Sequence, residues 1–244
     1  FFFTDPATTE IYTLSLRDFL PSNAALCSYR GNCYIKFTSS LLKDMADNAI
    51  VSLSAAAGTI TQAFVEDTTD PELVNFDLNM NTGTLVMTFD EPVLLTSFAP
   101  TEITVQSAGN SDAVSATLTG GISSVSASGL AVTLRLASAD LNKIKATESL
   151  AKASTNSFVS FTTSMITDKA YTPNAVVAVD TATAAAVQTY TADSTAPALA
   201  SFNFDLGLGL LTMTFNEPIR VSQLDYTKIT MQSAGNSAAL SRTP

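Results

Sequence analysis

Residues 70–93 read DPELVNFDLNMNTGTLVMTFDEPV, and residues 196–219 read APALASFNFDLGLGLLTMTFNEPI. The two stretches correspond without a gap at an offset of 126 positions. The same offset relates ITVQSAGNS at 103–111 to ITMQSAGNS at 229–237. A correspondence of this length predicts a tandem repeat, which favours an array or a polymer over a single catalytic unit.

The repeat also predicts where the units begin and end. Asn32 corresponds to Asn156 at an offset of 124, and Gln62 corresponds to Gln188 at an offset of 126. We therefore expect one complete unit between two half-units: a C-terminal half at 1–66, the complete unit at 67–192 and an N-terminal half at 193–244. In this phase the last residue leads back into the first, as expected for chains that join head to tail or for one segment of a longer covalent array.

Alternating hydrophobicity predicts the fold class. Residues 85–89 and 211–215 place Leu, Met and Phe on one face and mostly Thr on the other, which is typical of half-buried strands. Further strands are expected at 103–105, 130–134, 158–162 and 175–179. One short helix is expected, with Ser138 as its N-cap and an apolar stripe of Leu141, Ile144 and Leu150. About seven short strands in each unit predict an all-β fold of β-sandwich units.

Two motifs resemble a known family. DTTDPELVNF followed by GTLVMTFDEPV resembles the opening strands of bacterial-type Ig-like and cadherin-like repeats, and SMITDKAYTPNAVV at 164–177 resembles a late segment of these repeats. The resemblance implies Ig-like β-sandwiches and an extracellular or cell-surface location, as in adhesins, surface-layer proteins and stalks. With its low charge and its phase, the chain also resembles subunits of extracellular helical fibrils built of Ig-like domains.

Composition argues against several classes of function. A net charge of −10 argues against binding to the phosphates of nucleic acids. The longest apolar runs are too short for a membrane span. The chain has no histidine, which removes Ser-His-Asp and Cys-His catalytic systems. We therefore expect no enzyme activity and no cofactor.

The two cysteines, Cys27 and Cys33, are expected to form a local disulfide. The corresponding positions of the complete unit hold Ala151 and Ser157, so both cysteines are special to one unit. The alternative is a pair of unrelated free thiols.

Acidic residues near the expected linkers raise the question of calcium, which the family resemblance suggests. The candidates are Asp44, Asp67, Asp70, Glu91 and Asp168. Calcium requires six to eight oxygen ligands, and the second linker has Ala196 in place of Asp70. We expect turn residues and solubilising strand ends rather than a metal site.

Apolar residues of the half-units are the expected polymer interface. Phe1, Phe2 and Phe3 correspond to a polar turn of the complete unit, so the fold itself does not require them. With Leu211, Met213 and Phe215 they are expected to contact another copy of the chain.

These patterns predict a structural subunit of an extracellular filament whose partner is another copy of the same chain, joined by strand complementation. The alternative is a cell-surface adhesin or carbohydrate-binding array. The chain has no Asn-x-Ser/Thr sequon, and O-linked glycan on its Ser and Thr residues stays open.

Overall fold

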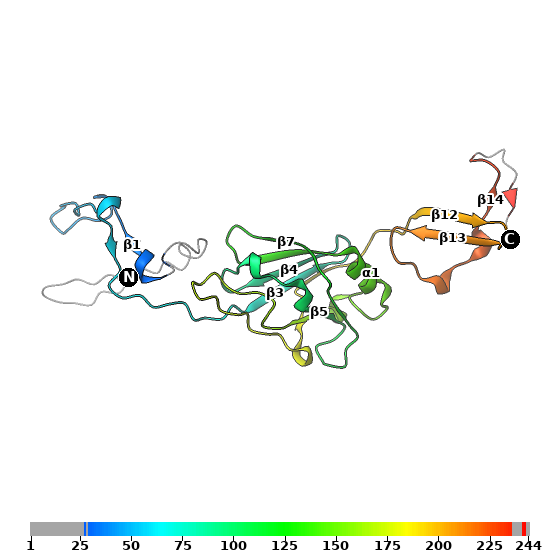
Figure 1. Cartoon of the computed structure of the whole chain (residues 1–244), viewed down its shortest axis with the longest axis horizontal. Coiled ribbons are helices and arrows are strands. Elements are labelled where there is room, and N and C mark those ends of the chain that lie inside the picture. The colour runs from blue at the N-terminus through cyan, green and yellow to red at the C-terminus, as the bar shows by residue number, and fades with distance from the viewer. Residues whose placement is uncertain (1–26, 28, 236–240, 243–244) are drawn as a thin grey trace.

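The structure, a computed structural model, describes residues 27, 29–235 and 241–242. A central body, residues 71–191, holds two large sheets (Figure 1). An N-terminal segment, the described residues up to 66, and a C-terminal segment, the described residues from 195, lie at opposite ends of the central body.

The larger sheet of the central body has five strands in the order β11-β3-β4-β8-β7. Its neighbours pair antiparallel, except that β11 runs parallel to β3. The strands are β3 (Leu73–Asn79), β4 (Thr84–Phe89), β7 (Gly121–Val125), β8 (Ala131–Leu136) and β11 (Thr189–Thr191).

The smaller sheet of the central body has four antiparallel strands in the order β10-β9-β5-β6. They are β5 (Ile103–Gln106), β6 (Ser115–Thr117), β9 (Phe158–Phe161) and β10 (Ala185–Ala186). Beside the sheets lie the helix α1 (Ser138–Ala146) and the 3-10 turns η3 (Leu95–Ser97), η4 (Pro100–Glu102), η5 (Ser154–Asn156) and η6 (Thr181–Thr183).

The two sheets share one hydrophobic core. Along β3 and β4 every second side chain is buried, as the alternation predicts. Phe76 and Met87 from the larger sheet and Val105 and Val159 from the smaller one belong to the same buried cluster. Strands in several sheets with a single α-helix among the described residues confirm the prediction of an all-β fold.

Two local predictions need correction. The helix is present, but Ala137 occupies the N-cap position and Ser138 is the first helical residue. The helix ends at Ala146, so Leu150, expected on its apolar stripe, lies beyond it although its side chain is buried. Residues 175–179 form no strand and make only two isolated bridges, Thr167 with Ala175 and Phe161 with Val179. The reason is that this segment bonds to three different stretches of backbone in turn, so it never runs along one neighbour.

The elements of the C-terminal segment follow the same order as those in the first half of the central body. β12 (Leu199–Asp205) and β13 (Leu210–Phe215) form a hairpin with the same irregularity near its start as β3 and β4. Gly83 and Gly209, in the two hairpin turns, have φ values of 68° and 65°, a region that favours glycine. The later elements also recur, as η7 (Val221–Gln223), η8 (Tyr226–Lys228), β14 (Met231–Gln232) and β15 (Ser241–Arg242).

Several elements of the N-terminal segment have the same order and pairing as elements in the second half of the central body. β1 (Tyr34–Ile35) pairs antiparallel with β2 (Thr59–Ile60), as β9 pairs with β10. η1 (Arg30–Asn32) and η2 (Ala55–Ala57) correspond to η5 and η6. The bridge between Phe37 and Leu53 corresponds to that between Phe161 and Val179.

Candidate interaction surface

The C-terminal segment presents core-type residues to solvent. Phe202 of β12 is 56% exposed, whereas Phe76, its counterpart on β3, is 1% exposed. Phe204 is 47% exposed, and its counterpart Leu78 is 1% exposed. The hairpin therefore keeps the apolar pattern of a core strand without the core that covers it.

On β13, the three predicted interface residues lie on the face that corresponds to the core. Leu211, Met213 and Phe215 are half-buried, whereas the equivalent residues of β4 are fully buried. The sequence prediction named these three and missed the more exposed Phe202 and Phe204 of β12. The offset of 126 onto Phe76 and Leu78 would have identified them.

Strand edges are also left without neighbours at this end. In the central body, β3 pairs with β11, β4 with β8, and β5 with β9. Each of these three pairs joins the first half of the unit to its second half. Within the described residues the C-terminal segment contains only the hairpins β12-β13 and β14-β15, so the three corresponding edges are open. Open strand edges beside an apolar face favour pairing with another chain.

The N-terminal segment also exposes apolar residues whose counterparts in the central body are buried. Ile35 of β1 is 59% exposed, whereas its counterpart Val159 on β9 is fully buried. Leu41 and Leu42 are also exposed, and they correspond to the fully buried Met165 and Ile166. In the central body these positions belong to the same buried cluster as Phe76 and Val105 of the first-half strands.

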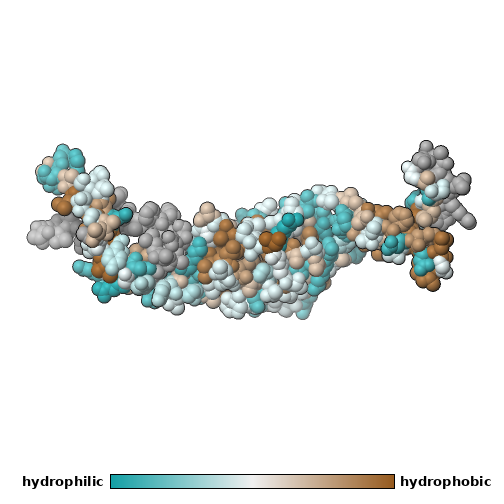
Figure 2. Space-filling view, turned by 45° about the horizontal axis from the view of Figure 1, so that its top comes forward, coloured by the Kyte–Doolittle hydropathy of each residue, from teal (hydrophilic) through white to brown (hydrophobic). Residues whose placement is uncertain are grey.

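Hydropathy on the molecular surface shows the same contrast. In Figure 2 hydrophobic surface gathers over the C-terminal segment and its connection to the central body, at the right of the view. Most of the central body shown there is polar or neutral, with smaller hydrophobic patches. Because large exposed apolar patches mark interaction sites, the C-terminal segment is the strongest candidate for one.

An ion-pair cluster connects the central body to the C-terminal segment. The Nζ of Lys145, on α1, lies 2.8 Å from an Asp193 oxygen and 3.0 Å from an oxygen of Glu217. Burial by itself would lower the pKa of Lys145, but the hydrogen bonds to the two carboxylates outweigh burial and raise it. Lys145 is therefore a fixed positive charge at this joint.

Where the N-terminal segment meets the central body, three acidic residues lie together. Ligand oxygens of Asp67, Glu91 and Asp168 lie within 4.8 Å of one another. Burial, reinforced by the charges of Asp67 and Asp168, raises the pKa of Glu91 to about 7. The structure thus brings together three of the five acids considered for calcium. Calcium takes six to eight oxygens, so these three carboxylates would need carbonyl or water ligands beside them to hold it.

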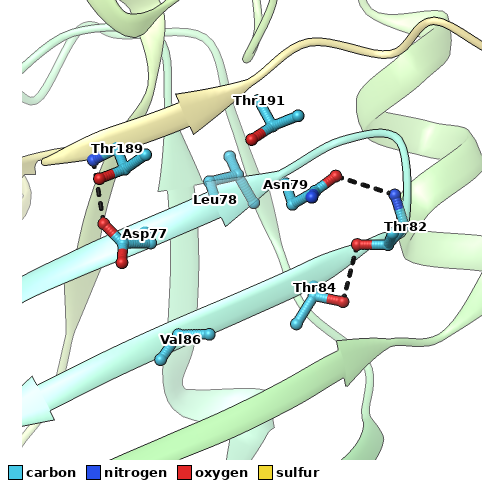
Figure 3. Close-up of a pocket in the computed structure, with 8 residues that line it drawn as sticks. All are labelled: Asp77, Leu78, Asn79, Thr82, Thr84, Val86, Thr189 and Thr191. Atoms are coloured by element: carbon cyan, nitrogen blue, oxygen red, sulfur yellow. Dashed lines mark hydrogen bonds between the residues drawn. The ribbon is translucent and has the colours of Figure 1, made fainter.

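A shallow pocket of about 270 Å³ lies on the outward face of the larger sheet (Figure 3). Its polar side chains bond to their neighbours: Asp77 accepts from the backbone N–H of Thr189, and Asn79 from that of Thr82. The hydroxyl of Thr82 donates to that of Thr84. Groups already paired in this way offer little to a ligand, and the pocket belongs to the surface of the sheet.

The remaining predicted site residues are two cysteines and three N-terminal phenylalanines. Cys27 and Cys33 form a disulfide with their Cα atoms 4.0 Å apart. Phe1, Phe2 and Phe3 lie outside the described residues.

Comparisons with known proteins give little further information. No family model matches the chain, and no curated protein matches it. A crystal structure of the S-layer protein rSbsC(31-844) is 16% identical at a TM-score of 0.25, covering 56% of this chain and 15% of that one. A structure of surface layer protein SbsC, domains 1-6, is 15% identical at a TM-score of 0.29, covering 60% of this chain and 18% of that one. The chain thus spans less than a fifth of either protein, and scores this low do not bear on its function.

In the part of the chain that the structure describes, no helix has the length and apolar character needed to cross a membrane.

Proposed function

We propose that the chain is a structural subunit of an extracellular filament of Ig-like units, in which the C-terminal segment of one copy is completed by the N-terminal segment of the next. The observation that carries this proposal is the exposure of Phe202 and Phe204 at positions that are fully buried in the central body. The central body supplies the template for the completed unit, since it contains both halves in one piece.

The strand pairs of the central body support a particular pairing between copies. In the central body Val105 of β5 lies opposite Val159 of β9. The corresponding residues are Met231 of β14 and Ile35 of β1 in the next copy. The parallel pairing of Asp77 with Thr189 likewise corresponds to Asn203 beside Ala63 of the next copy. The joint would therefore be built from backbone hydrogen bonds as well as apolar contacts, a strand-complementation mode of binding.

The two surfaces of one chain differ, so the contact is heterologous. Such contacts propagate into helical filaments unless the rotation between copies closes a ring. Figure 1 shows the two segments at opposite ends of the central body, which supports propagation over closure within one chain. The disulfide of Cys27 with Cys33 supports an oxidising, extracellular location.

A mixing experiment tests this polarity. Phe204→Asp should block the C-terminal surface, and Ile35→Asp should block the N-terminal one, because each places a charge at a position buried in the template. The matched control is Ile122→Asp, at a residue of the central body that is 75% exposed. The assay is analytical ultracentrifugation with negative-stain microscopy of the full chain.

Wild type and the Ile122→Asp control should form filaments, and each blocked variant alone should stay monomeric. An equimolar mixture of the two blocked variants should form dimers and stop, because only one productive joint remains. Wild type that stays monomeric at high concentration would refute the proposal. That result would favour the alternative of a longer covalent array, in which the chain following residue 244 completes the unit. Filaments formed by either blocked variant alone would also refute it.

A further inference from the structure

We infer that Lys145 of one copy is the counter-charge for Asp44 of the next, so that docking brings a third carboxylate to the Lys145 ion-pair cluster. This inference rests on the proposed function and names the charged contact that specifies the joint. Within one chain Asp44 and Lys145 belong to the N-terminal segment and the central body, and no ion pair between them is present among the described residues.

Asp44 is built into its loop in the same way as Asp168 of the central body. The Oδ1 of Asp44 accepts hydrogen bonds from the backbone N–H groups of Ala46, at 2.9 Å, and Asn48, at 2.8 Å. Its Oδ2 accepts from the side-chain amide of Asn48 at 2.9 Å. Asp168 accepts the equivalent bonds from Ala170 and from the backbone and side chain of Asn174. The carboxylate of Asp44 is therefore held in position before any partner arrives.

The central body shows where that carboxylate would lie in a completed unit. Asp168 forms a β-bridge with Val93, and its carboxylate lies in the cluster with Glu91 and Asp67. The side-chain amide of Asn174 also donates to the backbone carbonyl of Asp67.

Transferred by the repeat offset, the same contacts place Asp44 of the next copy opposite Ile219. Its carboxylate would lie beside Glu217 and Asp193 of the first copy. Asn48 of the next copy would then donate to the carbonyl of Asp193.

A positive counter-charge distinguishes the cluster around Glu217 from the cluster around Glu91. Around Glu91 the carboxylates have no ion pair among the described residues, and the pKa of Glu91 is raised to about 7. Around Glu217 the ammonium of Lys145, which is 13% exposed, already bonds to two carboxylates. Lys152 and Arg220 add positive charge near the same joint. A third carboxylate can therefore join the cluster around Glu217 without leaving a buried negative charge uncompensated.

A double-mutant cycle on the full chain tests the contact through the critical concentration for assembly. Lys145→Met should raise the critical concentration by about tenfold or more, and Asp44→Asn alone should change it by about twofold. With both substitutions it should fall at least about threefold below that of Lys145→Met, since one of the three carboxylates left without Lys145 is then neutral. The matched control combines Lys145→Met with Asp168→Asn. It removes the equivalent charge from the cluster around Glu91, and the critical concentration should stay as high as in Lys145→Met alone.

Each outcome decides the inference. Rescue by Asp44→Asn but not by Asp168→Asn supports it, because Asp44 can reach Lys145 in this way only when two copies have docked. Additive effects of Lys145→Met and Asp44→Asn overturn it, and so does equal rescue by the two aspartate substitutions. Failure of wild type to assemble is a separate result, which refutes the proposed function itself. Thermal unfolding of each variant checks that the central body is intact.

Discussion

Phe76 and Phe202 occupy the same position of the repeat in two different environments, and this gives the sharpest test of the assembly. Phe76→Ala removes a ring from the core of the central body, where it is 1% exposed. Phe202→Ala removes a ring that is 56% exposed in the isolated chain. The same substitution should therefore affect folding at one site and assembly at the other.

The expected sizes follow from the burial at each site. Phe to Ala in a core costs about 3–5 kcal/mol, so Phe76→Ala should lower the melting temperature of the central body by roughly 10–20 °C. A phenylalanine buries about 200 Å² when covered, and completing the unit would remove about half of that from water at Phe202. At about 25 cal/mol per Å² this is ~2.5 kcal/mol, an upper estimate. Most of it is lost in Phe202→Ala, which should raise the critical concentration about 30-fold.

Differential scanning calorimetry and pelleting assays measure the two effects separately. Phe202→Ala should leave the main unfolding transition of dilute monomer within about a degree of wild type, because surface truncations change stability little. Phe76→Ala should lower that transition strongly. If Phe202→Ala lowered the main transition as much and left the critical concentration unchanged, the C-terminal segment would be part of a core within its own chain, and the reasoning would be wrong.

Four further outcomes are expected. Because the folded-state pKa of Glu91 is raised from 4.5 to about 7, chiefly by burial, the free energy of unfolding should fall as pH rises through this window. Since the carboxylate keeps some solvent contact, we expect a fall of about 1–2 kcal/mol by chemical denaturation, absent in Glu91→Gln. A chelator should shift the melting temperature by no more than about a few degrees, and a larger shift would restore the calcium hypothesis. Intact-mass measurement after alkylation without reductant should show no added group on Cys27 or Cys33, whereas two added groups would contradict the disulfide. Finally, a fragment of residues 67–192 should unfold in one cooperative transition, and a disordered circular-dichroism spectrum would contradict its boundaries.

Much of the fold could be predicted because its strands alternate clearly. Residues 85–89 and 130–134 alternate with period two, and the structure has β4 and β8 there. The helix at Ser138–Ala146 was predicted at the right place, but only Leu141 and Ile144 of its expected apolar stripe lie in it. Residues 175–179 misled the prediction because Val-rich composition indicates a strand, but their hydrogen bonds depend on three separated partners that no local pattern reveals.

The proposed interface was only partly predictable for a different reason. The local sequence does not determine whether a side chain is exposed. Phe76 and Phe202 lie in similar stretches of sequence, but Phe76 is buried and Phe202 is exposed. The cluster around Lys145 was missed because its carboxylates come from the linker and from the end of β13, brought to α1 only by the fold. A lysine on a polar helix face carries no signal of such a contact.

The sheet topology determines what kind of joint the half-units could form. Both sheets of the central body cross the boundary between its halves, through the pairs β3-β11, β4-β8 and β5-β9. A second copy that completed the C-terminal segment would therefore extend both sheets, and apolar side chains would be buried between them at the same time. Breaking that joint would require the loss of strand hydrogen bonds and core packing together, as in the unfolding of a domain. A contact between preformed surfaces breaks without opening a sheet or a domain core. Filaments joined in this way would consequently owe their persistence to the same interactions that fold the central body.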